Sequence, residues 1–312
     1  MKLLGRICLV VLVVLAGLAI IFWTPDTNKN EMIAKYGGPG ATFATGVSGM
    51  QIHYRDQGPR DAPAMVLIHG SSSSLQTWEP LVDRLDQSFR VVSLDLPGHG
   101  LTGPHPQRDY SAAAMREAVF AVMDEVEISS AVWVGNSMGG WVSWQAGLSV
   151  PERIDAIVLL DPSGAPTQAK PPSNIGFRLM ASPLGKVLAK KFTPRFLVAA
   201  SIKQTVGDPK IVTELMIDRY WELLRFPGNR QATIDRAKIK RYSKQWDRLG
   251  TMSVPVLILW GAQDQVILVE DAVKFKTAIP DAQVIVYDGI GHLPMEEAPD
   301  LVARDIQSFL AQ

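Results

Sequence analysis

A serine between two glycines is the residue of this chain best placed to do chemistry. The apolar run Val132 to Val134 leads into Gly-Asn-Ser-Met-Gly at 135 to 139, and helical spacing follows. A strand, a sharp turn and a helix in this order form a nucleophile elbow, which exposes the serine hydroxyl. The two glycines leave space where larger side chains would collide, and the serine takes strained backbone angles. We therefore expect Ser137 to act as a nucleophile.

A serine hydroxyl needs a general base and an acid that orients the base. Of the five histidines, only His292 follows a flexible Gly-Ile-Gly lead-in after the last predicted strand. Asp264 follows the apolar run Val256 to Trp260 through a short Gly-Ala-Gln turn, and we expect it to be the acid. Asp161 ends the preceding predicted strand and is the alternative acid. The order serine, acid, histidine is typical of one hydrolase fold.

The helix that follows Ser137 suggests where negative charge would be held. Backbone N–H groups at a helix N-terminus face an anion, and here the first of them belongs to Met138. We expect the N–H of Met138 to bind a developing oxyanion on a carbonyl substrate.

Strands and helices alternate along most of the chain, and both kinds of segment are short. The strand-like runs are 64–68, 90–94, 131–134, 154–160, 256–260 and 283–287, and 47–54 alternates as an outer antiparallel strand. Helical spacing appears at 77–85, 111–125, 138–148, 269–278 and 299–310. This alternation predicts an α/β fold, a mostly parallel sheet with helices on both faces.

The stretch from Pro166 to Gly250 interrupts this alternation, because it holds prolines and helical segments but no clear central strand. It predicts a helical cap inserted between two strands, and we place the cap at 162–251 and the core at 46–161 and 252–312. The stretch contains 17 Lys or Arg and six Asp or Glu, a net charge of +11. Solvated helix faces explain this charge, and attraction to an anionic membrane is the functional alternative.

The N-terminus is the most apolar segment. Lys2 and Arg6 precede Ile7 to Trp23, which is 17 residues long and carries no charge. We expect residues 1–24 to be an uncleaved membrane anchor with the catalytic part on the non-cytoplasmic side, periplasmic or extracellular. A cleaved signal, which would leave a secreted protein, is the alternative. Residues 25–45 are rich in Gly, Pro and Asn and predict a linker without regular structure.

The composition excludes several classes of protein. With 47% hydrophobic and 20% charged residues, the chain is in the globular range. Lys plus Arg equal Asp plus Glu at 31 each, so no overall field attracts nucleic acid. The single cysteine, Cys8, excludes an intrachain disulfide and a cysteine-based metal site.

These motifs resemble the α/β-hydrolase superfamily over about residues 47–310. Gly-Asn-Ser-Met-Gly-Gly at 135–140, Trp-Gly-Ala-Gln-Asp at 260–264 and Gly-His-Leu-Pro-Met-Glu-Glu at 291–297 look like family V of the bacterial lipolytic enzymes. The apolar N-terminus adds a similarity to membrane-anchored monoacylglycerol lipases. The resemblance implies that Ser71, after His69-Gly70, supplies the other oxyanion N–H. It also implies that no metal or cofactor is needed.

The resemblance implies a serine carboxylic-ester hydrolase, an esterase or lipase that works through an acyl-enzyme. A cap roofs the triad in this superfamily, so cap residues and nearby loops form the acyl pocket. Our candidates for that pocket are Met180 in the cap, with Trp78 and Leu293 near the catalytic loops. Flexible Met and Leu side chains beside aromatics suit an acyl chain. We therefore expect medium-chain acyl esters or monoacylglycerols as substrates.

Differences between this chain and related families of the superfamily put the alternative reactions in order. Dehalogenases and epoxide hydrolases of the superfamily carry an aspartate where this chain has Ser137. Hydrolases that cleave carbon–carbon bonds of ring-fission products often carry Trp after the histidine and a glycine-rich turn after His-Gly, whereas this chain has Leu293 and the serines 71–74. That reaction is the first alternative, and a non-catalytic ligand receptor is the second. Perhydrolase activity would use the same triad.

Overall fold

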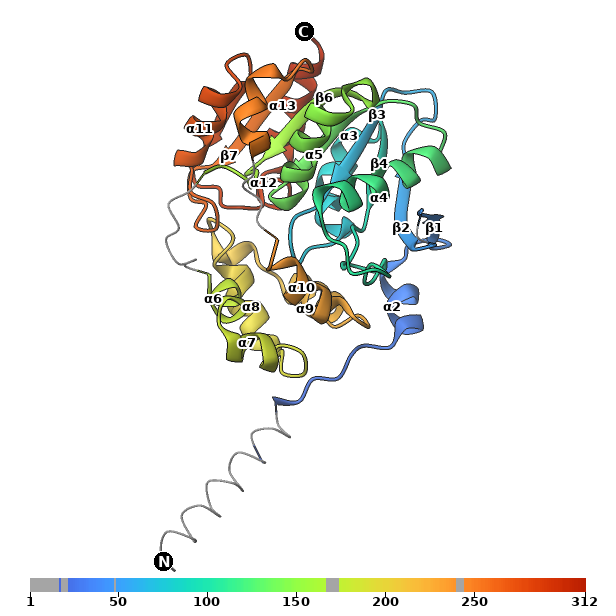
Figure 1. The fold of residues 1–312 in the computed structure, drawn as a ribbon, viewed down its shortest axis with the longest axis vertical. Coiled ribbons are helices and arrows are strands. Elements are labelled where there is room, and N and C mark those ends of the chain that lie inside the picture. Colours follow the sequence, from blue (N-terminus) through green and yellow to red (C-terminus); the bar gives the residue numbers. More distant parts are fainter. Residues whose placement is uncertain (1–16, 18–21, 48, 167–173, 240–243) are drawn as a thin grey trace, which may run out of the picture.

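The computed structural model describes residue 17 and residues 22–47, 49–166, 174–239 and 244–312 (Figure 1). Within these ranges, no helix is both long enough and apolar enough to span a bilayer. Most of the predicted anchor, residues 1–24, lies outside the described residues.

An eight-stranded sheet forms the centre of the molecule, in the order β1-β2-β4-β3-β5-β6-β7-β8. Its strands are β1 (Thr42–Thr45), β2 (Gln51–Gln57), β3 (Ala64–Ile68), β4 (Arg90–Leu94), β5 (Ala131–Asn136), β6 (Ile154–Leu160), β7 (Val256–Gly261) and β8 (Gln283–Tyr287). The pairings from β4 to β8 are parallel, and β2 is antiparallel to both β1 and β4. The predicted mostly parallel sheet is thus confirmed.

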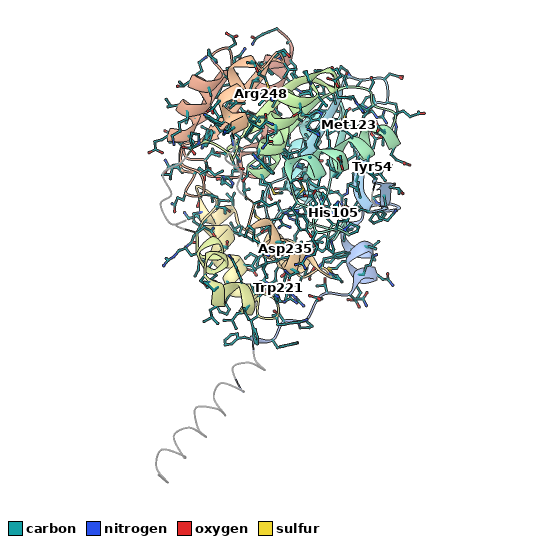
Figure 2. The ribbon with its side chains drawn as sticks, viewed as in Figure 1. Tyr54, His105, Met123, Trp221, Asp235 and Arg248 are labelled. Atoms are coloured by element: carbon teal, nitrogen blue, oxygen red, sulfur yellow. The ribbon has the colours of Figure 1, made fainter. Side chains whose placement is uncertain are left out.

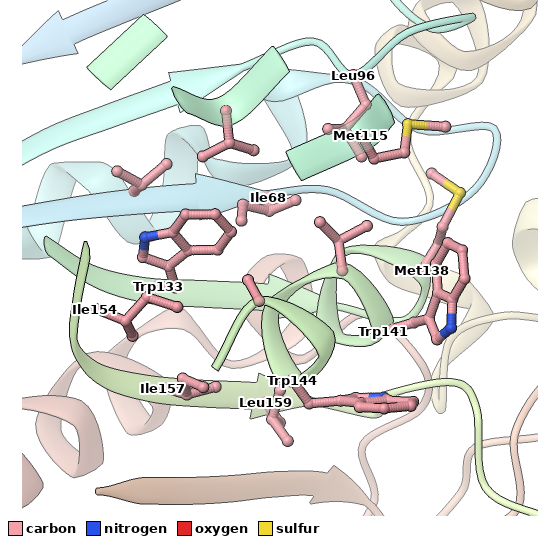
Figure 3. Close-up of a cluster of buried hydrophobic side chains, with 14 of the residues drawn as sticks. Ile68, Leu96, Met115, Trp133, Met138, Trp141, Trp144, Ile154, Ile157 and Leu159 are labelled. Atoms are coloured by element: carbon pink, nitrogen blue, oxygen red, sulfur yellow. The ribbon is translucent and has the colours of Figure 1, made fainter. Parts of the chain in front are cut away.

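Two hydrophobic clusters cover the two faces of this sheet. Successive strand residues alternate between them: Val66 and Ile68 belong to one cluster, and Met65 and Leu67 to the other. Helices α4 (Ala112–Glu125), α5 (Met138–Ser149) and α11 (Glu270–Ala278) pack in the first cluster, and α3 (Glu79–Leu85) and α13 (Pro299–Leu310) in the second. Figure 3 shows part of the first cluster, with Trp133 of β5 near Ile68 and Ile154, and with Met138, Trp141 and Trp144 of α5 further to the right. Because both faces are covered, the central strands are mostly apolar.

Most of the described residues between β6 and β7 lie in helices, as the insertion predicts. They form α6 (Ile175–Ala181), α7 (Pro183–Leu188), α8 (Arg195–Lys203), α9 (Glu214–Leu224) and α10 (Asn229–Arg236), with the 3₁₀ turns η3 (Pro209–Ile211) and η4 (Lys244–Thr251). Helices α6 to α10 gather at one end of the molecule, the lower end in Figure 1. Figure 2 shows Trp221 and Asp235 in this lower part, and Met123 and Arg248 in the upper part. The limits of the predicted cap and core stay predictions.

The remaining short elements lie in loops that frame the sheet. They are η1 (Leu75–Trp78) after β3, η2 (Pro151–Arg153) before β6, and α12 (Pro294–Glu297) after β8. Both η1 and α12 come directly after loops that the sequence assigns to catalysis.

The prediction of an irregular linker over residues 25–45 is wrong for much of that range. Helix α2 (Lys29–Tyr36) begins after Asn28, whose side chain accepts hydrogen bonds from the N–H groups of Asn30 and Glu31. Strand β1 then covers β2, so the strand expected at the edge of the sheet is the second strand. A helix of eight residues is marginal by itself. Here the buried Met32 packs on Leu101, Leu223 and Phe226, and this tertiary contact is absent from any local pattern.

Residues 22–37 therefore form a strap, the N-terminal strap, that lies along the cap helices. The N–H of Thr24 donates to the carbonyl of Lys191 at 2.8 Å. The side chain of Asp26 accepts from Nη2 of Arg230 at 2.5 Å, and Arg230 is buried. Figure 1 shows this segment running from beneath α7 to α2. The strap joins the N-terminal end of the chain to the cap.

Candidate active site

Ser137 lies at a tight turn between β5 and α5. Its φ is +54° and its ψ is −110°, a strained combination for a residue with a side chain. A Cβ at Gly139 would lie 1.9 Å from the carbonyl oxygen of Ile68, and a Cβ at Gly135 would lie 2.5 Å from the backbone of Gly139. Both glycines are needed because α5 begins in contact with β3 and β5.

His292 is paired with a buried carboxylate. Its Nδ1 lies 2.6 Å from Oδ2 of Asp264, and both side chains are almost fully buried. The other oxygen of Asp264 accepts from the N–H groups of Val266 and Ile267 at 2.7 and 3.0 Å. A proton on Nδ1 shared with Asp264 leaves Nε2 as the basic nitrogen of the imidazole.

A side chain next to Ser137 connects the two halves of the site. Nδ2 of Asn136 donates to the carbonyl of His292 at 3.0 Å and to that of Leu160 at 3.2 Å. The N–H of Ser137 also donates to Leu160, at 2.9 Å. The ends of β5 and β6 and the histidine loop are therefore held together immediately before the serine.

Asp161 lies in the same cluster but has a different environment. Its Oδ1 accepts from the N–H of Gly261 at 2.9 Å, and the residue has a positive φ of +46°. Burial and the charge of Asp264 raise the pKa of Asp161 well above its ordinary value. Since Nδ1 of His292 lies within hydrogen-bond distance of Asp264, the geometry favours Asp264 as the acid partner.

In the described part of the chain, one group of acidic and histidine side chains is close enough to share a metal ion. It consists of Asp161, Asp264 and His292. Their potential ligand atoms all lie within 4.8 Å of one another. The imidazole and the carboxylate of Asp264 are already at hydrogen-bond distance from each other. This contact fits a base and its orienting acid better than two ligands on one metal, whose donor atoms point at the ion.

The two residues expected to donate to an oxyanion lie together beside the elbow. Oγ of Ser71 is 3.3 Å from Sδ of Met138. A Cβ at Gly70 would be 3.1 Å from Cβ of Ser137, so the loop after β3 passes close to the serine. This arrangement suits backbone donors from both residues, and their role as donors stays a prediction.

The three pocket candidates have different positions. Trp78 is fully buried in the hydrophobic cluster that includes Leu81 and Leu85, which gives it a packing role. Leu293 is buried directly after His292, and its N–H donates to Glu297. The side chain of Met180 lies outside the described part of the structure. Contact of these side chains with a substrate stays a prediction.

Glu297 is a site residue that the sequence reasoning did not single out. Its carboxylate accepts from the N–H groups of Gly291 and Leu293 on the histidine loop, and from that of Gly207 in the cap region, at 2.7 to 3.1 Å. The N–H of His292 donates to the carbonyl of Thr205 at 2.7 Å. Burial raises the pKa of Glu297. In the sequence, Glu297 is the last residue of the motif at 291–297, five positions after the histidine.

Glu296 makes a second link between cap and core. It accepts from Nη2 of Arg219 at 2.6 Å, from the hydroxyl of Tyr220 at 2.8 Å and from that of Thr77 at 2.5 Å. Burial and the charge of Glu296 raise the pKa of Tyr220. Arg219 and Glu296 also line a surface cavity of about 450 Å³ between α2 and α9. The histidine loop is thus fastened to α9 on one side.

The other buried histidines lie on β2 and in the loops after β3 and β4. Nδ1 of His53 lies 2.7 Å from Oδ2 of Asp95, and that carboxylate also accepts from the N–H groups of Leu75 and Leu101. Burial lowers the pKa of both His69 and His99, whose rings are 4.8 Å apart. These contacts shape the loops beside the site, consistent with a structural role for His99.

Comparison with known proteins agrees with this geometry. Residues 65–305 match the model of the Alpha/beta hydrolase family. Lipase 1 from Psychrobacter immobilis is 27% identical over 302 residues, which cover 91% of this chain and 86% of the lipase.

Solved structures share the fold. A meta-cleavage product hydrolase from Pseudomonas fluorescens superposes with a TM-score of 0.74 at 22% identity, over 88% of this chain and 97% of that one. A structure described as a membrane phospholipase A gives a TM-score of 0.75 at 22% identity, over 100% and 98% of the two chains. At these identities the likeness concerns the fold alone.

Proposed function

Because the chain belongs to the alpha/beta hydrolase family, we propose that it is a serine carboxylic-ester hydrolase that works through an acyl-enzyme. One observation carries the proposal: His292 is paired at 2.6 Å with a buried Asp264 and is held through Asn136 to the elbow that bears Ser137. Acyl transfer requires a nucleophile, a base and an acid that orients the base, and this pairing supports that assignment of roles.

The reaction proceeds in two halves. Nε2 of His292 takes the hydroxyl proton as Oγ of Ser137 bonds to the ester carbon, and the N–H groups of Ser71 and Met138 hold the oxyanion. His292 then gives that proton to the departing alcohol, which leaves an acyl-serine. In the second half, His292 takes a proton from water, the hydroxide attacks the acyl carbon, and the proton returns to Ser137 as the carboxylic acid leaves. Asp264 stabilises the imidazolium in both halves.

We propose medium-chain acyl esters or monoacylglycerols as substrates. The support is the relative described as a lipase and a largely buried site beside Met138 and Leu293. Each methylene of an acyl chain that is buried contributes about 0.8 kcal/mol. Four further carbons in the pocket would therefore raise kcat/KM by roughly two orders of magnitude.

The test is a panel of p-nitrophenyl esters and monoacylglycerols of graded chain length, assayed on the full chain and on Ser137→Ala. We expect kcat/KM to rise from acetyl to medium chains, and a fluorophosphonate probe to label the wild type but not Ser137→Ala. An optimum at acetyl would contradict the chain-length proposal. Absence of labelling in a folded protein would favour a ligand receptor without catalysis.

Carbon–carbon bond hydrolysis of ring-fission products is the second candidate. It is favoured by the structural similarity to a meta-cleavage product hydrolase. Against it stand Leu293 after the histidine and the serines at 71–74. Both reactions would use the same serine, so a variant of Ser137 cannot distinguish them. A dienoate substrate assayed beside the ester panel does.

We also propose that residues 1–24 attach the protein to a membrane, with the catalytic part on the non-cytoplasmic side. The support is the uncharged run of 17 residues from Ile7 to Trp23 after Lys2 and Arg6. Fractionation of cells that express the full chain, followed by protease treatment from either side, tests both parts of this proposal.

A further inference from the structure

Large apolar side chains are exposed on one face of α7. Leu184, Val187 and Leu188 are exposed to 68%, 66% and 43%. They are three and four positions apart, so they share one side of this helix. A soluble surface rarely gathers such residues without a binding partner.

The exposed face continues from α7 onto α8 and the beginning of the N-terminal strap. Phe196 of α8 is 58% exposed and its ring is 6.1 Å from that of Phe22. Trp23 is 50% exposed and its ring is 5.7 Å from that of Phe192. In Figure 1, α7 and the start of the strap lie at the same end of the molecule, opposite the C-terminus. We call Trp23, Leu184, Val187, Leu188 and Phe196 the α7–α8 face.

Basic residues predominate in the segment that carries this face, where Arg195 is paired with Glu214 and Asp218 of α9. Residues 175–204 contain six Lys or Arg and no Asp or Glu. Lys190 and Lys191 are exposed at the end of α7, and Nζ of Lys191 lies 5.7 Å above the ring of Trp23. Lysines on an apolar surface extend their stems along it and reach phosphate groups with their ammonium ends. Aromatic rings with neighbouring lysines are typical of the interface between lipid and water.

We propose that the α7–α8 face docks on the surface of a bilayer that contains anionic lipids. The position of the apolar run identifies a bilayer as the partner of this face. The uncharged run Ile7 to Trp23 ends at Trp23, which is part of the face. A bilayer that holds this run therefore lies against α7. The exposed lysines complement its anionic headgroups, at about 1 kcal/mol for each basic residue near the surface.

The strap gives this docking a fixed orientation. Besides the bond of Thr24 to Lys191, Nη1 of Arg230 donates to the carbonyl of Thr24 at 2.7 Å, and the N–H of Thr27 donates to the carbonyl of Arg225 at 2.9 Å. These bonds tie the membrane end of the chain to the loop after α7, to the end of α9 and to α10. The cap therefore faces the lipid and α11 faces away. The inference rests on the proposed membrane attachment and is independent of the ester chemistry.

The test uses the full chain with Cys8→Ser and a nitroxide at Val187→Cys, reconstituted in vesicles of phosphatidylcholine and phosphatidylglycerol. The matched control is Val273→Cys on α11, whose valine is 68% exposed. We expect the label at 187 to be reached by oxygen and shielded from an aqueous nickel complex, and the label at 273 to show the reverse. Equal access of nickel to both labels overturns the proposal.

Two further arms exclude other causes. The label at 187 is also measured in detergent at several protein concentrations. If its shielding from nickel increases with protein concentration, a second copy of the chain covers the face, and the proposal is overturned. Lys190→Glu with Lys191→Glu should raise nickel access at 187 in the anionic vesicles, whereas Lys276→Glu on α11 should not. A full chain that fails to enter vesicles would overturn both docking and attachment, while its esterase activity in detergent would still report on the proposed function.

Discussion

Nδ1 of His292 lies 2.6 Å from Oδ2 of Asp264, although the two residues belong to loops after different strands. The loop of Asp264 follows β7 and the loop of His292 follows β8, and these strands are parallel neighbours. The carboxyl ends of parallel neighbours lie at the same edge of a sheet, so the pairing follows from the topology.

The first prediction concerns the nucleophile. Ser137→Ala should lower kcat for esters by at least ~10⁴-fold, because the hydroxyl forms the acyl-enzyme and adds little to packing. Steady-state kinetics and thermal denaturation of the same preparation measure the two effects. A folded variant that keeps more than a small part of its activity would show that another residue is the nucleophile.

The second prediction separates the two acids. Asp264→Asn should lower kcat by roughly 10⁴-fold, since it removes the carboxylate that orients and stabilises the imidazole. Asp161→Asn should lower it far less, because the amide still accepts from Gly261 and replaces a carboxyl whose pKa is raised by burial and by Asp264. If kcat falls more in Asp161→Asn than in Asp264→Asn, the assignment is wrong.

The third prediction concerns the pH dependence of stability. The folded protein keeps a proton on Asp161 at pH values where the unfolded chain, with an ordinary pKa near about 4, has lost it. The free energy of unfolding therefore falls as pH rises from about 4 toward the raised pKa. Asp161→Asn has no such proton to lose.

The expected result is that the Tm of the wild type declines relative to that of Asp161→Asn as pH rises from about 4 to about 9. Thermal denaturation of both proteins across this range measures the difference, and the other titrating groups cancel in the comparison. A constant difference would mean that Asp161 is charged in the folded state.

The fourth prediction concerns the histidine loop. Glu297→Gln replaces an acceptor oxygen with an amide donor that faces backbone N–H groups, at a cost of about 2 kcal/mol. We expect a lower Tm and a lower kcat with an almost unchanged KM, because the loop that carries His292 loosens while the acyl pocket stays. Glu270→Gln, an exposed glutamate on α11, is the control. Loss of stability with full kcat would limit Glu297 to a structural role.

The fifth prediction concerns the N-terminal strap. A chain that lacks residues 1–21 should stay folded and active, because Thr24 and Asp26 keep their bonds to the cap. A chain that lacks residues 1–37 loses those bonds and uncovers the apolar partners of Met32, so it should melt at lower temperature and aggregate. Equal melting temperatures for the two truncations would show that the strap adds no stability.

Local sequence patterns were enough to predict the nucleophile elbow and the parallel sheet. A strand before Gly-x-Ser-x-Gly and a helix after it define Ser137 without distant contacts, because the constraint is the backbone turn itself. The alternation of apolar runs with helical stretches likewise predicts parallel strands covered on both faces, since a buried face has the period of its own element. In the same way, glycines before His292 mark a flexible loop at the end of the last strand.

Tertiary structure decided what depends on residues far apart in the chain. Both Asp161 and Asp264 follow strands, and only the packing of β6, β7 and β8 shows which carboxylate meets the imidazole. Glu297 holds the histidine loop because the N–H of Gly207, 90 residues away in the sequence, and the N–H groups of that loop all donate to its carboxylate. Helix α2 forms because Met32 finds an apolar site on the cap. The sequence by itself determined each local turn and its chemistry, and folding determined the partners, because a buried charge or an eight-residue helix is stabilised only by groups that the chain brings from elsewhere.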